Sequence, residues 1–128
     1  MSKIARLEFR NVLGIEEREI QAGKINIISG KNEAGKTSIL ESIEKAIYNT
    51  ERRAKFVREG QTEGTLYVEL DDGLSIDRKV KEDGSGRVKV EKNGASVPKP
   101  ETYLKNTSTI KGILQMVRLE SAKVRLML

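Results

Sequence analysis

The chain has 128 residues, enough for one domain with its own hydrophobic core, and its 24 basic and 19 acidic side chains give a net charge of +5. It contains no cysteine and no histidine. Disulfides, thiolate or imidazole metal ligands, and cysteine or serine–histidine catalysis are therefore excluded for this sequence. The sequence has neither a signal-peptide pattern nor an apolar stretch of membrane-spanning length, so we expect a cytoplasmic protein without membrane contact.

The first part of the chain predicts short strands that lead into a helix. Apolar and polar side chains alternate from Lys3, and Gly14 interrupts this pattern. A polar second strand follows, suited to the edge of a sheet, and then a β-branched run suited to a buried strand. Apolar residues next recur at helical spacing. The predicted elements are strands over residues 3–9, 15–20 and 24–29, a loop over residues 30–35 and a helix from Lys36 to about Tyr48.

The next region predicts a loop followed by antiparallel strands. Residues 51–63 are charged and contain glycine, which predicts a mobile loop whose basic residues either contact DNA or a partner or are simply solvated. Residues 64–97 contain alternating runs separated by turn signals at Asp72-Gly73, Asp83–Gly86 and Asn93-Gly94. These residues predict an antiparallel β-meander. Asp72 follows an apolar run, as a Mg²⁺ ligand would, but the Asp-Gly pair favours a turn.

The C-terminal part of the chain predicts helices. Residues 101–105 predict a short helix, and from Ser108 apolar side chains recur at helical spacing to the last residue. We therefore divide the chain into a lobe at residues 1–105 and a helical tail at residues 106–128. Gln115 falls within this tail, where we expect a solvated helix position rather than a catalytic glutamine.

Gly30–Thr37 matches the phosphate-loop (Walker A) pattern G-x-x-x-x-G-K-[ST]. A chance match is the alternative, but a predicted strand before the motif and a predicted helix after it favour a true phosphate loop. Its glycines let the backbone approach phosphates, its N–H groups form an anion nest, and the helix dipole adds positive potential. In this pattern Lys36 contacts the β/γ-phosphates of ATP, Thr37 ligates Mg²⁺ and Ser38 donates to the α-phosphate. The predicted cofactor-binding residues are Gly30, Asn32, Glu33, Ala34, Gly35, Lys36, Thr37 and Ser38, with Thr37 as the metal ligand and no catalytic residue.

The sequence resembles the start of SMC/RecF/SbcC-type ATPases. The resemblance rests on Leu7–Ile15, on Ile25–Ile43 with its unit Asn32-Glu-Ala-Gly-Lys, and on Gly73 and Ile76-Asp-Arg78, and it covers about residues 3–105. Together with the predicted elements it implies an α/β fold: a P-loop NTPase half-domain with a mixed sheet, a P-loop helix, an antiparallel β-meander and a C-terminal helix. It also implies an ABC-class head that binds Mg-ATP, pairs with another head lobe as a homo- or hetero-oligomer and acts on DNA in repair or recombination.

The chain departs from the family pattern at several points. Leu13 stands where the family has a basic residue that approaches the nucleotide. The family's second half, with its signature serine, Asp-Glu pair and switch histidine, has no counterpart in this sequence. The tail after about Asn106 does not continue the family pattern. We therefore expect a truncated or split ATP-binding lobe that does not hydrolyse ATP alone.

Other functional hypotheses remain open. Such a lobe could be a non-catalytic interaction or inhibitory module that pairs with itself or with a full-length ATPase through its apolar tail and exposed sheet. A small independent kinase is less favoured, because the meander offers no acidic or arginine-rich lid over an acceptor site.

Overall fold

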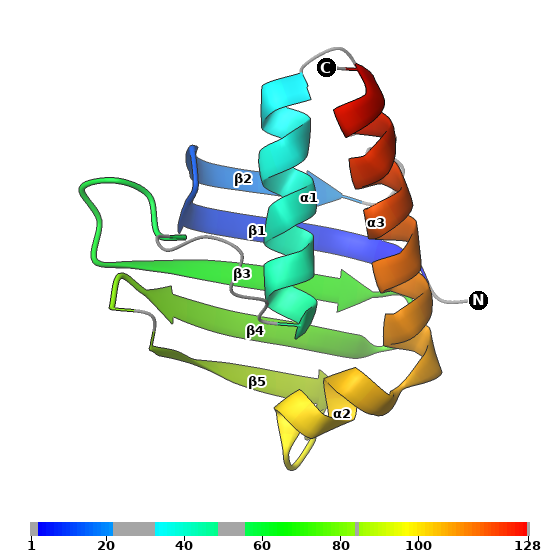
Figure 1. Cartoon of the computed structure of the whole chain (residues 1–128). Coiled ribbons are helices and arrows are strands. Elements are labelled where there is room, and N and C mark those ends of the chain that lie inside the picture. Colours follow the sequence, from blue (N-terminus) through cyan, green and yellow to red (C-terminus); the bar gives the residue numbers. More distant parts are fainter. Residues whose placement is uncertain (1–2, 22–32, 49–55, 84, 128) are drawn as a thin grey trace.

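The computed structural model describes residues 3–21, 33–48, 56–83 and 85–127, and for some of these it describes only the backbone. The described elements form two layers, an antiparallel sheet and a pair of helices that cover one face of it (Figure 1). A short third helix lies beside β5. The opposite face of the sheet is not covered by any described element.

Six strands pair in the order β2-β1-β3-β4-β5-β6, and every described pairing is antiparallel. The strands are β1 (Ile4–Val12), β2 (Ile15–Gln21), β3 (Glu63–Leu70), β4 (Leu74–Lys81), β5 (Gly86–Lys92) and β6 (Ala95–Ser96). They confirm the α/β class, the predicted meander and the edge position of β2 in the described sheet. The predicted strand at residues 24–29 lies outside the described residues, so the mixed character of the sheet stays a prediction.

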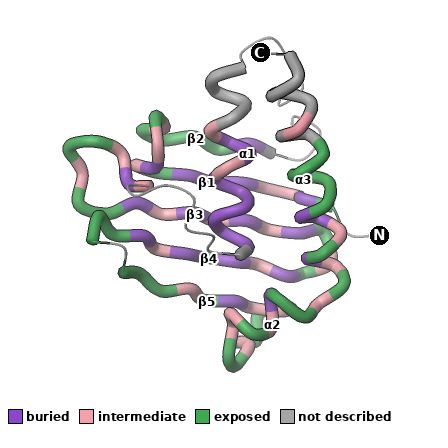
Figure 2. The backbone as a smooth tube through the Cα atoms, viewed as in Figure 1, coloured by how far each residue is buried: buried purple, intermediate pink, exposed green. Residues whose placement is uncertain are grey.

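The alternation of side chains along the strands explains why only one face of the sheet is covered. On β3, Leu66 and Val68 are buried, whereas the intervening Thr65 and Tyr67 are half-buried. This pattern is typical of an antiparallel sheet with one face on the core and one face towards water. Figure 2 shows the buried residues gathered where the strands meet the two long helices. The largest fully buried side chains are Phe9, Leu7, Ile43, Ile47, Leu66, Leu74, Ile76, Leu104, Ile110, Val12, Val68 and Val90.

The described helices are α1 (Glu33–Tyr48), α2 (Pro100–Asn106) and α3 (Ser108–Met127). The last two confirm the short helix and the helical tail that the sequence predicts. The predicted start of the first helix at Lys36 is wrong, because α1 begins at Glu33 within the predicted loop. A carboxylate is favoured in the first turn of a helix, where it faces the positive end of the dipole. The apolar stripe begins only at Ile39 and therefore could not locate this start.

The two long helices lie side by side on the sheet and run in opposite directions (Figure 1). Both use an apolar face at helical spacing to reach the core. The buried apolar residues are Ile39, Leu40, Ile43, Ala46 and Ile47 on α1 and Ile110, Ile113, Leu114 and Val117 on α3. As a result, the beginning of α1 and the end of α3 lie at one end of the molecule, and α2 lies at the other.

The segment before β3 is tied to the hairpin between β1 and β2. The Leu13 N–H donates to the Phe56 carbonyl, and the Arg58 N–H donates to the Asn11 carbonyl, both at 2.8 Å. The described residues before β3 therefore form a loop, as predicted, and these hydrogen bonds tie that loop to the hairpin. Charge and glycine content suggested a loop, but they did not reveal these long-range backbone hydrogen bonds.

Candidate phosphate-binding site

The predicted nucleotide-binding residues fall just before α1 and in its first turns. Gly30 and Asn32 lie outside the described residues, and residues 33–37 are described by their helical backbone alone. Ser38 is half-buried, and its carbonyl accepts a hydrogen bond from the Ser42 hydroxyl at 2.7 Å. The contacts assigned to phosphate and Mg²⁺ therefore stay predictions.

The backbone at the start of α1 has a feature that suits an anion. The first N–H groups of any α-helix lack a partner within the helix, and the dipole concentrates positive potential at the same end. α1 has 16 residues and is therefore about 24 Å long. Ile39, Ile43 and Ile47 are each buried along its length. Packing against the sheet thus sets the direction in which the start of α1 points.

A buried arginine holds the other end of α1. Arg78 points from β4 towards the helices and is 3% exposed. Its Nε donates to the Ala46 carbonyl at 3.0 Å, and its Nη2 donates to Oε1 of Glu101 at 2.5 Å. Ala46 lies in the last turn of α1, where carbonyls lack a partner within the helix. One guanidinium therefore joins β4, the end of α1 and the first turn of α2.

Sequence reasoning noted Arg78 only as part of the family resemblance and missed this role. The available signal was strand alternation, because Arg78 shares its face of β4 with the buried Leu74, Ile76 and Val80. A charged residue at a core-facing position requires hydrogen-bonding partners.

A second charged pair joins α1 to α3. The carboxylate of Glu44 is buried on α1, and the Nε of Arg118 on α3 donates to its Oε1 at 3.2 Å. Next to Glu44, Lys45 is also buried, and its Nζ lies 5.6 Å from the centroid of the Phe56 ring. These contacts fix the polar side of α1, which periodicity alone would assign to solvent.

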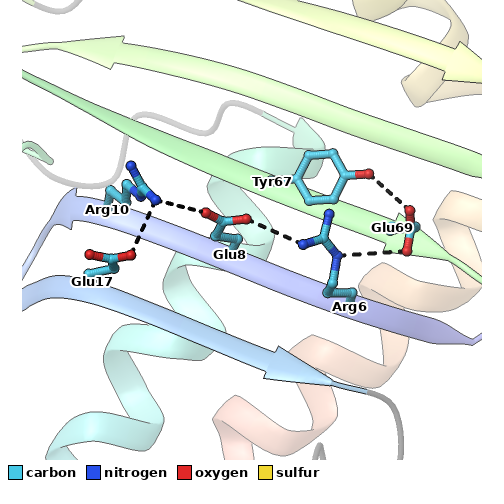
Figure 3. A network of polar contacts seen from close by, with 6 residues as sticks. All are labelled: Arg6, Glu8, Arg10, Glu17, Tyr67 and Glu69. Atoms are coloured by element: carbon cyan, nitrogen blue, oxygen red, sulfur yellow. Dashed lines mark hydrogen bonds and ion pairs between the residues drawn. The ribbon is translucent and has the colours of Figure 1, made fainter.

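The open face of the sheet carries a network of ion pairs and hydrogen bonds (Figure 3). The network consists of Arg6, Glu8, Arg10, Glu17, Tyr67 and Glu69. The guanidinium of Arg6 lies 4.8 Å from the centroid of the Tyr67 ring, whose hydroxyl donates to Glu69 at 3.0 Å. Partial burial raises the pKa of the Tyr67 phenol; Arg6 opposes this shift and Glu69 adds to it. Positive and negative side chains are paired in this network. The network therefore stabilises the open face of the sheet and does not form a patch of only positive or only negative charge.

The structure decides between the alternatives that the sequence offered for Asp72 and for Gln115. Asp72 Oδ1 accepts a hydrogen bond from the Leu74 N–H at 3.1 Å, and Oδ2 lies 3.2 Å from Lys92 Nζ. Asp72 therefore belongs to the β3–β4 turn, as the Asp-Gly pair predicted. Gln115 is exposed on α3, which confirms its predicted solvated position.

Comparison with known proteins identifies the family to which the chain belongs. A family model described as an AAA domain matches residues 6–123. The chain belongs to this AAA-domain family. One curated relative is the DNA double-strand break repair Rad50 ATPase of Saccharolobus solfataricus, which is 35% identical over 86 residues. These residues cover 62% of this chain and 10% of that protein. Arcadin-4 of Pyrobaculum calidifontis is 32% identical over 111 residues, covering 76% of this chain and 14% of that protein.

The AAA domain also resembles a solved structure of the recombination mediator protein RecF with ATP. The TM-score is 0.57 at 13% identity, and the match covers 82% of this chain and 31% of that chain. This likeness shows a shared fold. The family model, the Rad50 relative and the shared fold with RecF together confirm the predicted relationship to SMC/RecF/SbcC-type ATPases. The chain spans no more than 14% of the two curated relatives. Its described helices include none with the length and hydropathy needed to cross a membrane.

Proposed function

We propose that this AAA domain binds Mg-ATP through Gly30–Ser38. The observation that carries the proposal is the start of α1 at Glu33, which directly follows the first residues of the phosphate-loop pattern. A helix N-terminus preceded by glycine is suited to phosphate oxygens. Lys36 would contact the β/γ-phosphates, and the Thr37 hydroxyl would ligate Mg²⁺. Bound Mg²⁺ would neutralise phosphate charge, while the chain's own part is to bind and orient the nucleotide.

Hydrolysis by this lobe would require residues from outside residues 1–128. Phosphoryl transfer to water needs a positioned water and additional charge stabilisation besides a phosphate loop. The RecF structure, determined with ATP, extends well beyond the part that this chain matches, since the match covers 31% of it. We therefore propose an ATP-binding lobe that completes its site by pairing with another lobe and has negligible ATPase activity alone.

The proposed setting is DNA repair or recombination in the cytoplasm. Support comes from the name of the Rad50 relative, a DNA double-strand break repair ATPase. Exposed Lys99, Lys105 and Lys111 on the α2–α3 side and the net charge of +5 favour an anionic partner. Binding to a DNA duplex that weakens steeply with salt would support this setting.

Calorimetry with Mg-ATP tests the nucleotide site. We expect saturable binding by the unaltered protein and a loss of at least tenfold in affinity for Lys36→Ala. Lys105→Ala is the matched control, because it removes the same charge from the exposed end of α2 and should bind like the unaltered protein. Failure of the folded, unaltered protein to bind Mg-ATP would contradict the proposal.

One observation favours a second candidate function, an interaction or inhibitory module. Met116 and Leu119 lie one turn apart on α3 and are 40% and 59% exposed. Exposed apolar side chains on one helix face suit a protein partner. If this function is correct, sedimentation will show concentration-dependent association that Met116→Lys and Leu119→Lys abolish, with or without ATP. Association that appears only with Mg-ATP would instead support the pairing of ATP-binding lobes.

A further inference from the structure

We propose that Arg78 is a positioning residue for the nucleotide site, acting through the Ala46 carbonyl at the far end of α1. The inference rests on the proposed ATP-binding function, because its consequence is measured at the start of the same helix. Arg78 itself would not touch the nucleotide. Its effect would depend on where it holds α1 relative to the sheet.

The contacts of Arg78 suit this role better than a general contribution to packing. Its side chain is 4% exposed, so the guanidinium has left water and depends on protein partners. Nε binds the Ala46 carbonyl on α1, and Nη2 binds the Glu101 carboxylate on α2. A guanidinium is planar and its donors point in fixed directions, so the bond from Nε to the Ala46 carbonyl favours one position of α1.

The location of the contact along α1 matters for the site. The apolar side chains of α1 pack against the sheet, but their burial supplies no directional bond along the helix axis. A hydrogen bond to a carbonyl in the last turn opposes both sliding and rotation of the helix. Because α1 is a rigid element of 16 residues, such a displacement at Ala46 also moves its first turn at Glu33. Misplacement of phosphate-binding groups by a fraction of an ångström weakens binding.

A positive charge at the end of α1 and a negative charge at its start would both interact favourably with the helix dipole. Arg78 places a positive charge at the C-terminal, negative end of the helix dipole. A phosphate at the N-terminal end would face the positive end of the same dipole. The cation and the anion would therefore each stabilise α1 at its own end, and the link from Arg78 to the nucleotide site would be mechanical, through the position of α1.

The experiment compares Arg78→Met, Arg78→Lys and Glu101→Gln with the unaltered protein. Mg-ATP affinity is measured well below each variant's unfolding midpoint, so that all samples are folded. We expect the Kd to rise about tenfold for Arg78→Met. Arg78→Lys should restore part of the affinity, since a lysine can still reach one acceptor. Glu101→Gln should change the Kd less than twofold, because the contact between Arg78 and Ala46 is retained.

Arg10→Met is the matched control, since Arg10 is ion-paired on the open face of the sheet.

A nucleotide-free measurement separates this inference from the proposed function. Amide hydrogen exchange should become at least fivefold faster in the first turns of α1 in Arg78→Met, and the control should leave it unchanged. If the unaltered protein does not bind Mg-ATP, the proposed function fails and this exchange measurement alone decides the role of Arg78. Faster exchange confined to the last turn of α1 and to α2 would overturn the inference. An unchanged Kd in Arg78→Met, or an equal rise in Glu101→Gln, would also overturn it.

Discussion

The guanidinium of Arg118 lies against the carboxylate of Glu44, with Nε 3.2 Å from Oε1, and the two side chains differ sharply in exposure. Glu44 is 9% exposed, whereas Arg118 is 51% exposed. Burial of a carboxylate costs free energy unless hydrogen-bond donors compensate for its lost hydration. Arg118 on α3 supplies one such donor. The contact therefore links the helical tail to the helix of the predicted phosphate loop.

Removal of Arg118 should destabilise the protein. We expect Arg118→Met to lower the free energy of unfolding by about 1 kcal/mol, because one charge-assisted hydrogen bond to a buried carboxylate is lost while Arg118 itself is partly solvated. A double-mutant cycle with Glu44→Gln, followed by urea unfolding, should give a coupling energy of about 0.5–1 kcal/mol. Lys111→Met, at an exposed position on the same helix, should change stability by less than about 0.5 kcal/mol. Equal effects of Arg118→Met and Lys111→Met would contradict the prediction.

The turns of this fold could be predicted from the sequence because their signals are local. Asp72-Gly73 and Asn93-Gly94 each connect neighbouring strands, and Gly73, Asn93 and Gly94 all have positive φ. The insertion of β1 between β2 and β3 could not be predicted in this way. β1 pairs Leu7 with Val68, far along the chain, and no local pattern encodes such a partner. The same reason explains the missed contacts of residues 56–58 with the β1–β2 hairpin.

Around the candidate site, the sequence identified the residues of the phosphate-loop motif but not the side chains from other elements that contact α1. The phosphate-loop spacing identified Lys36 and Thr37 as candidates, because this motif is contiguous. The groups that fix α1, Arg78 and Arg118, come from separate elements and were not predicted. Arg118 looks like an ordinary surface charge in its own segment, and the alternation along β4 places Arg78 on the core-facing side without revealing its partners. Only the fold shows that both contact α1, at the Ala46 carbonyl and at Glu44.

Gly94 and Gly112 offer a matched test of backbone conformation. A Cβ built at either position meets no atom within 4 Å, but Gly94 has a φ of +84°, whereas Gly112 lies in the helix α3. Gly94→Ala should therefore lower stability by about 1–2 kcal/mol through backbone strain alone. Gly112→Ala should raise it by about 0.5–1 kcal/mol through helix propensity. Thermal and urea unfolding of both variants measure these values, and a shift of the same sign in both would be inconsistent with the described turn.

Gly64 is required for a different reason, the close approach of β3 to β1. A Cβ there would lie 2.5 Å from the Asn11 carbonyl oxygen and 2.8 Å from that of Arg10. These are backbone atoms, so relief requires the paired strands to separate. We expect Gly64→Ala to lower the free energy of unfolding by about 1–3 kcal/mol or more. Hydrogen exchange should also quicken at the Arg58 amide, which donates to the Asn11 carbonyl. Stability within about 0.5 kcal/mol of the unaltered protein would show that this end of β1 is not packed as described.

Stability at alkaline pH should depend on Tyr67. Partial burial raises the pKa of its phenol in the folded protein above the ordinary value of about 10. The folded state therefore holds this proton to higher pH than the unfolded chain does. The resulting stabilisation is complete below about pH 10 and is lost as the pH rises through the folded-state pKa. Above about pH 10 the unfolding free energy should thus fall more steeply with pH in the unaltered protein than in Tyr67→Phe, until the folded-state pKa is passed.

The measurement is urea unfolding at a series of pH values, together with absorbance of the phenolate. The difference in absorbance between the unaltered protein and Tyr67→Phe reports the titration of Tyr67. Glu69→Gln provides the control, because the Tyr67 hydroxyl donates to Glu69 at 3.0 Å and this contact adds to the raised pKa. That variant should titrate at lower pH than the unaltered protein, because it loses the contact with Glu69 that adds to the raised pKa. A Tyr67 that titrates at or below about pH 10 would mean that the open face is more solvated than the Arg6–Tyr67–Glu69 contacts imply.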